Sequence, residues 1–267
     1  MLGSPIAHSL SPVLHRAAYG ALGLDWTYEA IECDEGGLAD VLADVRRDPR
    51  WAGLSLTMPL KTVAVGLCDE VRTGLGAVNT IVVTGDGLVG HNTDVDGIAV
   101  GLAKLVSAGA DVSRIALLGA GGTARAAVEA LSGAGTRQLT VHVRDAGRAQ
   151  DVVALAEARG LAVEVVALTA LTGPASGLTV VSTLPGSAGA ALVDAGFTVN
   201  GPLLDVVYEP WPTALASSAV RAGRPVVGGL DVLVGQAARQ VALMTGQPAP
   251  VAAMQQAGEA ALAARAG

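Results

Sequence analysis

Two of the four short polar segments in the N-terminal part of the chain end in residues that can handle protons. Lys61 ends Thr57-Met58-Pro59-Leu60-Lys61, directly after an apolar run, and Asp94 ends His91-Asn92-Thr93-Asp94. A lysine ammonium can donate a proton or stabilise a developing alkoxide, and a carboxylate can orient it. Each residue also has an ordinary interpretation, Lys61 as a surface lysine and Asp94 as the N-cap of a helix.

The other two segments carry hydroxyl and amide groups that can hold the oxygens of a ligand. Ser9 and Ser11 lie within His8-Ser9-Leu10-Ser11-Pro12, where they could instead cap a helix that begins at Pro12. Asn79 lies inside an apolar strand, where an amide is costly unless it is hydrogen-bonded. All three are therefore candidates for ligand binding, each with a structural alternative.

A glycine-rich loop, Gly119-Ala120-Gly121-Gly122-Thr123-Ala124, follows an apolar run and opens a helical stretch. Gly119 permits a tight turn, Gly121 lets the backbone approach a pyrophosphate, and Ala124 allows the helix to lie close to the strand. The free amides at the helix N-terminus then face the anion. A purely structural turn would look similar, but the strand–loop–helix context favours a dinucleotide site.

The residues after the second strand of this region bear on which dinucleotide binds. An NAD site has an acidic residue there, about 20 positions after the loop, to bond the ribose hydroxyl. Here the strand ends Val143-Arg144-Asp145, with Arg148 one turn further on. Two arginines can hold a 2′-phosphate, so NADP is predicted and NAD is less favoured. The alternatives are that both arginines are only solvated cations, and that Asp145 is an N-cap or opposes a phosphate.

From residue 114 onward, apolar runs alternate with helical stretches, which predicts a parallel, doubly wound sheet. The predicted strands are Arg114–Leu118, Gln138–Val143, Ala162–Val166, Thr179–Thr183, Leu203–Val207 and Pro225–Val227. Helices are predicted at Ala124–Ser132 and Ala146–Arg159. The last stretch, Leu230–Ala266, indicates two alanine-rich helices broken at Gly246-Gln247-Pro248.

Before that region the elements are mixed. Strands are predicted at Asp25–Cys33 and Ala52–Thr57, with a helix over Gly37–Arg47 between them and another from Asp96 through Leu105. Ala77–Val83 and Leu88–His91 flank a hairpin turn, whose Asp86-Gly87 pair should supply positive φ angles.

The sequence thus predicts an α/β protein of two domains. Residues 1–98 and 231–267 would form an α/β domain to which the C-terminal helices return. Residues 99–230 would form a Rossmann-type, doubly wound domain that binds the dinucleotide.

Composition excludes several classes of protein. The net charge of −7 lacks the basic surface that nucleic-acid binding needs. No stretch of about 18 apolar residues is free of interruptions, so we expect no membrane span, and the first residues predict no secretory signal. Cys33 and Cys68 are the only cysteines and lack metal-ligand spacing, so we expect reduced thiols, no metal and a cytoplasmic location. The sequence leaves monomer and homodimer open.

Seven motifs, in order along the chain, resemble those of the shikimate dehydrogenases. They are Gly3–His15, Leu56–Lys61, Gly76–Thr80, Asn92-Thr93-Asp94-x-x-Gly97, Gly119–Ala124, Asp205-Val206-Val207-Tyr208-x-Pro210-x-x-Thr213 and Gly229-x-x-x-Leu233-Val234-x-Gln236. The resemblance implies reversible, NADPH-dependent reduction of 3-dehydroshikimate to shikimate, a small-molecule reaction of aromatic amino-acid (chorismate) biosynthesis.

The resemblance also implies residue roles. Lys61 and Asp94 match the catalytic pair. The positions that match substrate-binding residues are Ser9, Ser11, Thr57, Lys61, Asn79, Asp94, Tyr208 and Gln236. The nicotinamide would lie near Thr183 and Leu184, and the Gly229 region would close the cleft.

The chemistry of such a pair follows from general principles. Oxidising a secondary alcohol transfers a hydride to the nicotinamide, and the hydroxyl proton must leave to a nearby base. In reverse, the developing alkoxide needs a proton or a positive charge, and Lys61 can supply both. We therefore treat Lys61 and Asp94 as one coupled unit that shares a proton.

Two other functions remain possible on the same scaffold. One is a quinate/shikimate dehydrogenase that prefers NAD, since Val143 and Asp145 replace the Asn and Thr that the family usually has around Arg144. The other is a non-catalytic, NADP-sensing regulator, although a sensor would need none of Lys61, Asp94 and Gln236. Only Met1 and Leu2 precede Gly3, so we expect weak pairing of the first strand.

Overall fold

The computed structural model describes residues 1–173 and 177–266, and the chain forms two compact units. Unit 1 comprises Met1–Thr93 and Val234–Gly267, and unit 2 comprises Asp94–Leu233. Gly267, in the predicted range 231–267, and residues 174–176, in the predicted range 99–230, lie outside the described residues. The chain passes from one unit to the other after Thr93 and again within a helix, α8 (Gly229–Thr245).

Unit 2 is built on a six-stranded parallel sheet with the order β12-β11-β10-β7-β8-β9. Its strands are β7 (Arg114–Leu118), β8 (Gln138–Val143), β9 (Ala162–Ala167), β10 (Thr179–Ser182), β11 (Leu203–Asp205) and β12 (Val226–Val227). The chain starts at β7, moves outward to β9, and then returns to β10 on the other side of β7. This strand order confirms the predicted doubly wound fold. Ligands of such folds bind at the switch point, outside the carboxyl ends of the strands.

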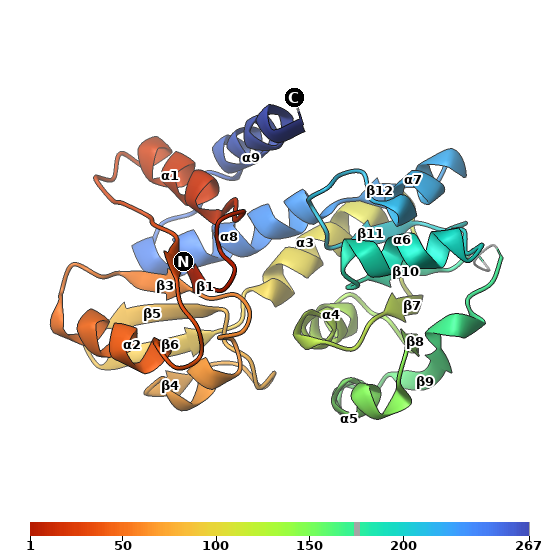
Figure 1. Ribbon diagram of the computed structural model, residues 1–267, viewed down its shortest axis with the longest axis horizontal. Coiled ribbons are helices and arrows are strands. Elements are labelled where there is room, and N and C mark those ends of the chain that lie inside the picture. Colours follow the sequence, from red (N-terminus) through yellow and green to blue (C-terminus); the bar gives the residue numbers. More distant parts are fainter. Residues whose placement is uncertain (174–176, 267) are drawn as a thin grey trace. The chain divides into compact units, whose positions relative to one another are not determined.

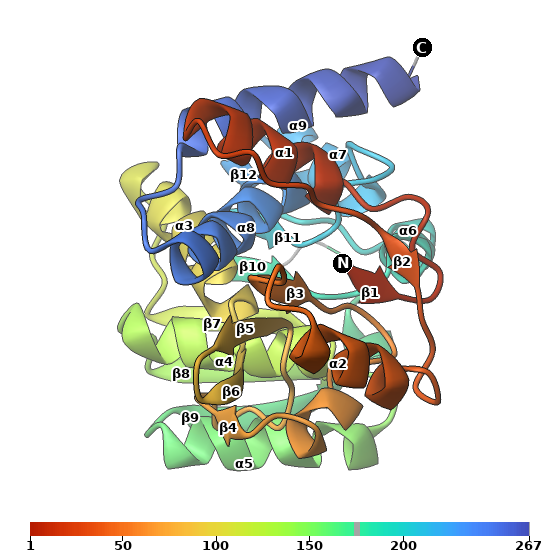
Figure 2. The ribbon, with the colours of Figure 1, turned by 90° about the vertical axis from the view of Figure 1, so that its left-hand side faces the viewer.

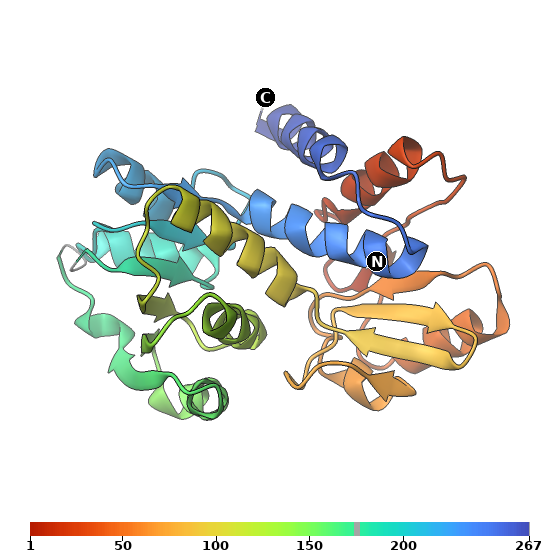
Figure 3. The ribbon, with the colours of Figure 1, turned by 180° about the vertical axis from the view of Figure 1, so that it is seen from behind.

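Among the described residues, five α-helices lie wholly within this unit (Figures 1 and 3): α3 (Asp94–Ser107), α4 (Gly122–Gly133), α5 (Gln150–Ala158), α6 (Gly186–Asp194) and α7 (Ala214–Arg221). Helices α4 and α5 pack side by side, as do α6 and α7. The predicted helix Ala146–Arg159 is wrong in its first turn, which is a separate 3₁₀ helix over Ala146–Ala149. The carboxylate of Asp145 accepts the backbone N–H of Gly147 there at 2.9 Å, and this tight turn starts the 3₁₀ segment.

Unit 1 holds two small sheets. The first pairs β1 (Leu2–Gly3) with β2 (Ile31–Glu32) in parallel. The second has the order β3-β5-β6-β4, with strands β3 (Gly53–Ser55), β4 (Glu70–Val71), β5 (Thr80–Thr84) and β6 (Gly87–His91). Its helices are α1 (Ser11–Ala21), α2 (Leu38–Arg47) and α9 (Val251–Ala266), together with the end of α8 and a 3₁₀ turn over Val63–Gly66.

Two local predictions in unit 1 are wrong in part. Of the predicted strand Asp25–Cys33, only Ile31–Glu32 is paired, because β1 offers it only two partner residues. The predicted hairpin is confirmed, with β5 antiparallel to β6, but its turn differs. Gly87 has positive φ (127°) whereas Asp86 does not, since the described residues adopt positive φ only at glycines.

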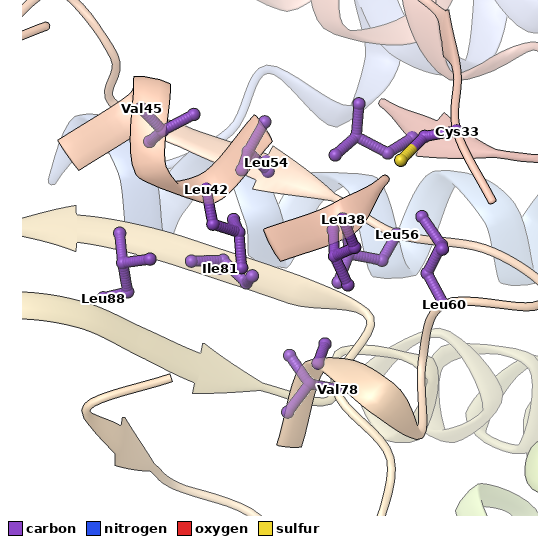
Figure 4. Close-up of a cluster of buried hydrophobic side chains, with 12 residues drawn as sticks. Cys33, Leu38, Leu42, Val45, Leu54, Leu56, Leu60, Val78, Ile81 and Leu88 are labelled. Atoms are coloured by element: carbon purple, nitrogen blue, oxygen red, sulfur yellow. The ribbon is translucent and has the colours of Figure 1, made fainter. Parts of the chain in front are cut away.

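The core of unit 1 lies between α2 and the four-stranded sheet (Figure 4). Leu38, Leu42 and Val45 recur at helical spacing on the buried face of α2. They meet Leu54 of β3 and Ile81 of β5, both 1% exposed or less. Elsewhere in unit 1, α1 and α9 lie side by side (Figure 2), so both ends of the chain contribute to this unit. Among the described residues, no helix has the length and apolar character that a membrane crossing requires.

Candidate active site

Asn79 is the centre of a buried polar group in unit 1. It lies directly before β5 and is 1% exposed. Its Oδ1 accepts the backbone N–H of Thr93 at 2.7 Å, the hydroxyl of Thr80 at 2.8 Å and the hydroxyl of Thr93 at 3.2 Å. Its Nδ2 donates to Oε1 of Gln236 at 3.1 Å. The amide that interrupts an apolar run therefore has the hydrogen bonds that its burial requires.

Helix α8 brings two glutamines to this group from one face, because residues four apart are neighbours on a helix. Gln236 is half-buried, and Gln240 is 4% exposed. Gln240 accepts from the Ser55 hydroxyl at 2.8 Å and donates to the hydroxyls of Thr80 at 3.1 Å and Thr93 at 3.2 Å. Sequence reasoning found Gln236 and missed Gln240, whose burial depends on the face that α8 turns toward Ser55 and Thr80.

The backbones of both candidate catalytic residues are tied to the Asn79 segment. Lys61 is half-buried, and its carbonyl accepts the N–H of Val78 at 2.7 Å. Asp94 is 6% exposed and follows Thr93, whose N–H is held by Asn79. By these contacts the residue before Asn79 fixes Lys61, and the side chain of Asn79 fixes the peptide that leads into Asp94.

Ser9 and Thr57 lie in loops of unit 1, and Ser11 begins the helix that follows the first of these loops. Ser11 is buried and is the first residue of α1, whose N-cap residue, Leu10, makes no side-chain cap bond. Ser11 therefore does not act as the cap, whereas Ser9 Oγ accepts the N–H of Ser11 at 3.2 Å. Thr57 is half-buried just after β3, and its N–H donates to the carbonyl of Leu2 at 2.9 Å.

In unit 2, the glycine loop after β7 packs against the segment after β10. Gly119 has a φ of +103°, which favours glycine. A Cβ atom there would lie 2.6 Å from Oγ1 of Thr183 and 3.4 Å from Leu184 Cδ2. The structure thus brings together three residues that sequence reasoning placed at the cofactor.

Gly121, by contrast, borders empty space. It has φ −84° and ψ −169°, is exposed, and directly precedes α4. A Cβ atom at Gly121 would meet no other atom within 4 Å. The first N–H groups of α4 lack partners within the helix and face an anion well. Ala124 is fully buried behind them, so these residues fit the pyrophosphate of a dinucleotide.

The two predicted phosphate-binding arginines lie beyond β8. Arg144 and Arg148 are both exposed, and neither forms an ion pair within the described part of the chain. Asp145, between them, accepts the N–H of Gly147 and so serves as an N-cap. Its carboxylate is thereby engaged with the backbone, and the two exposed guanidinium groups could hold a phosphate.

The ends of β11 and β12 position Tyr208 and Gly229. Asp205 is 1% exposed and accepts the hydroxyl of Thr213 at 2.7 Å, and burial raises the pKa of its carboxyl group. Gly229 donates to the carbonyl of Val207 at 3.2 Å, and a Cβ atom there would lie 2.3 Å from a backbone oxygen. Tyr208 is half-buried in the segment between Asp205 and Thr213.

The predicted cofactor residues thus share one position in unit 2, the carboxyl ends of its parallel strands. Gly119 to Ala124 follow β7, Arg144 follows β8, Thr183 follows β10, and Gly229 follows β12. In the part of the chain that the structure describes, no group of His, Cys, Asp and Glu side chains could hold a metal ion.

Two parts of the chain match family models. Residues 1–81 match the shikimate dehydrogenase substrate binding domain, and residues 229–257 match the shikimate 5′-dehydrogenase C-terminal domain. The shikimate dehydrogenase (NADP(+)) of Sphingopyxis alaskensis is 38% identical over 257 residues, which cover 94% of this chain and 91% of that relative.

Solved structures are similar over nearly the whole chain. The shikimate dehydrogenase of Mycobacterium tuberculosis is 41% identical with a TM-score of 0.85, and 97% of each chain is covered. The shikimate 5-dehydrogenase of Thermus thermophilus, in complex with NADP(H) and shikimate, is 33% identical with a TM-score of 0.80, and 98% of each chain is covered.

Proposed function

This chain belongs to the shikimate dehydrogenase family, and we propose that it reduces 3-dehydroshikimate reversibly to shikimate with Lys61 and Asp94 as its catalytic pair. It is an oxidoreductase that acts on a CH–OH group with NADP, in the biosynthesis of aromatic amino acids. The resemblance of the seven motifs is confirmed at the level of the family. The residue roles are our proposal.

The observation that carries the proposal is the position of Asn79. Its side chain bonds Gln236 and the peptide before Asp94, and its segment bonds the backbone of Lys61. One buried amide thus connects Gln236 with the peptide before Asp94, and the backbone next to that amide holds Lys61. A fold without a polar ligand would gain little from a buried amide at this place, because apolar side chains pack there at lower cost.

The proposed mechanism assigns proton transfer to the protein. Bound NADP supplies the hydride chemistry. Lys61 holds the proton that the substrate oxygen gains on reduction and takes it back on oxidation, while Asp94 orients the ammonium group and the hydroxyl. Asn79 and Gln236, with Ser9, Ser11, Thr57 and Tyr208, bind the carboxylate and the remaining hydroxyls of the substrate.

We further propose a division of labour between parts of the chain. Residues 1–98 and 231–267 supply all the proposed substrate-binding residues except Tyr208, and residues 99–230 bind NADP through the glycine loop, Arg144 and Arg148. The open space at Gly121 supports the second assignment. We also propose that the enzyme is cytoplasmic and is a monomer or a homodimer. Sedimentation of the purified protein would distinguish the monomer from the homodimer. Two free thiols, Cys33 and Cys68, support the location.

Replacement of Lys61 tests the mechanism. Lys61→Met should lower kcat for shikimate oxidation by about a hundredfold or more, because it removes the proton donor, and should leave NADP binding unchanged. Lys104→Met is a matched control, since Lys104 is the only other lysine and pairs with Asp231 on the surface of unit 2. Near-normal turnover of Lys61→Met would remove Lys61 from the mechanism.

The same assay separates the alternatives. The absorbance of reduced nicotinamide is followed with shikimate or quinate as substrate and with NADP or NAD as cofactor. The rates give the preferred substrate and the preferred cofactor directly. Preference for NAD or quinate would indicate a quinate/shikimate dehydrogenase. No turnover with any combination would favour a non-catalytic, NADP-sensing protein.

A further inference from the structure

Gln240 is a buried carboxamide whose orientation is fixed from one side. The hydroxyl of Tyr28 donates to Ser55 Oγ at 2.7 Å, and Ser55 donates in turn to Gln240 Oε1 at 2.8 Å. All three side chains are buried. The amide oxygen of Gln240 therefore faces Ser55, and its NH₂ group faces the other way.

The NH₂ group of Gln240 directs the protons of two threonines. It donates to Thr80 Oγ1 at 3.1 Å and to Thr93 Oγ1 at 3.2 Å. A hydroxyl has a single proton, and Asn79 Oδ1 lies 2.8 Å from the Thr80 hydroxyl and 3.2 Å from the Thr93 hydroxyl. The two hydroxyls also lie 3.2 Å from each other, so one threonine can donate to the other while at least one proton goes to Asn79 Oδ1. With the backbone N–H of Thr93, Asn79 Oδ1 has at least two donors, so its amide cannot turn over without losing them.

The direction of these bonds reaches Gln236. With the oxygen of Asn79 held, its Nδ2 donates to Gln236 Oε1 at 3.1 Å. Because the amide of Gln236 is planar, its NH₂ group is then directed away from Asn79. The orientation of Gln240 thus reaches Gln236 through the threonine hydroxyls and the amide of Asn79.

We propose that Gln240 is a positioning residue, which fixes this direction so that Gln236 presents N–H donors to the substrate. The inference rests on the proposed function, in which Asn79 and Gln236 bind the substrate. It requires that the substrate group at Gln236 be a hydrogen-bond acceptor, a carboxylate or a hydroxyl oxygen.

The test is Gln240→Glu, which keeps the shape of the side chain and changes its donor. The introduced carboxylate, when ionised, cannot donate to Thr80 or Thr93, so their protons turn to it and Asn79 Oδ1 loses its hydroxyl donors. The KM for shikimate should rise about 10- to 100-fold, while kcat changes less and the KM for NADP stays the same.

The pH dependence separates positioning from general damage. Protonation of the introduced glutamate restores an O–H donor, so the ratio of variant to wild-type kcat/KM should rise as pH falls from roughly 9 to 6. The titratable neighbours stay neutral over that range. Burial lowers the pKa of His15 on α1, which contacts Gln240, to about 4, and lowers the pKa of the Met1 amino group, whose charge acts on His15, to about 5. Burial raises the pKa of Tyr28.

Two further variants complete the experiment. Gln247→Glu makes the same charge change at an exposed position between α8 and α9 and should behave as wild type. Gln240→Met has no hydrogen-bonding amide, so it should raise the KM without recovery at low pH. Unchanged shikimate KM in both Gln240 variants would overturn the inference, as would a loss in Gln240→Glu that is the same at every pH. A wild-type protein that does not oxidise shikimate would instead overturn the proposed function.

Discussion

Single residues in the site differ in how far the sequence reveals them. Asn79 interrupts an apolar run, and a buried amide in that setting is a signal by itself. Gln240 stands in an alanine-rich helix, where a polar residue looks like part of the solvated face. Its burial follows from the face that α8 turns toward Ser55 and Thr80, and only the structure supplies that contact.

At this scale, Arg144 is the residue that tests cofactor choice. Arg144→Ala should raise the KM for NADP about tenfold or more, because an exposed guanidinium is lost beside the proposed 2′-phosphate. The KM for NAD, which lacks that phosphate, should change little. Steady-state kinetics with each cofactor measure the two values.

Arg221→Ala is the control for this experiment. Arg221 is exposed at the end of α7 in the same unit. Its replacement removes the same charge at a position that has no proposed role in cofactor binding. If Arg144→Ala kept the wild-type preference for NADP, the assignment of the 2′-phosphate to Arg144 would be wrong.

At the scale of elements, prediction succeeded where an apolar run has a full set of partners. The predicted bounds of β7 and β8 equal the observed ones, whereas β10 and β11, also flanked on each side, end earlier than predicted, at Ser182 and Asp205. The predicted strand Asp25–Cys33 has the right alternation, but most of it finds no partner strand among the described residues. Helices α6 and α7 were missed, because both are short and rich in small residues.

The glycine loop offers a matched pair of substitutions with different expected effects. Gly119→Ala should destabilise the protein by about 1–3 kcal/mol, since it combines positive φ with a Cβ contact at 2.6 Å. Gly121→Val should leave stability nearly unchanged, because its backbone is extended and nothing lies within 4 Å of a Cβ atom. Its side chain would instead occupy the proposed pyrophosphate space and raise the KM for NADP about tenfold or more.

Thermal unfolding of the two variants measures their stability, and kinetics at varied NADP concentration measure the KM for NADP. A Gly121→Val protein that binds NADP normally would contradict the placement of the pyrophosphate at α4. A Gly119→Ala protein as stable as wild type would contradict the tight contact with Thr183.

At the scale of the whole molecule, acid stability depends on buried ionisable groups. His15 is fully buried and stacks on Tyr28, with ring centroids 4.0 Å apart. Burial lowers its pKa from 6.5 to about 4. Between these pH values the unfolded chain takes up a proton that the folded chain does not, so the unfolding free energy falls as pH falls. Asp205 acts in the opposite sense, because its pKa is raised by burial.

We therefore expect His15→Phe to flatten the acid limb of stability. The ring keeps its stacking on Tyr28, while the uptake of a proton on unfolding is removed. Wild type should lose on the order of 3 kcal/mol more than His15→Phe between pH 6.5 and pH 4, measured by urea unfolding at each pH. Asp205 is present in both proteins and cancels in the comparison. Parallel stability curves would show that His15 is not the acid-sensitive group.

The hydrogen bond between Asn79 and Gln236 joins residues 157 positions apart, and this has a consequence for the order of synthesis. The ribosome releases Asn79 long before Gln236, so the polar group of unit 1 can close only after α8 has been made. Unit 2 is one continuous segment, Asp94–Leu233, and can fold as it emerges. In a nascent chain the oxygen of Asn79 can therefore meet Thr80 and Thr93 early, whereas its NH₂ group gains Gln236 only after the whole of unit 2 has been made.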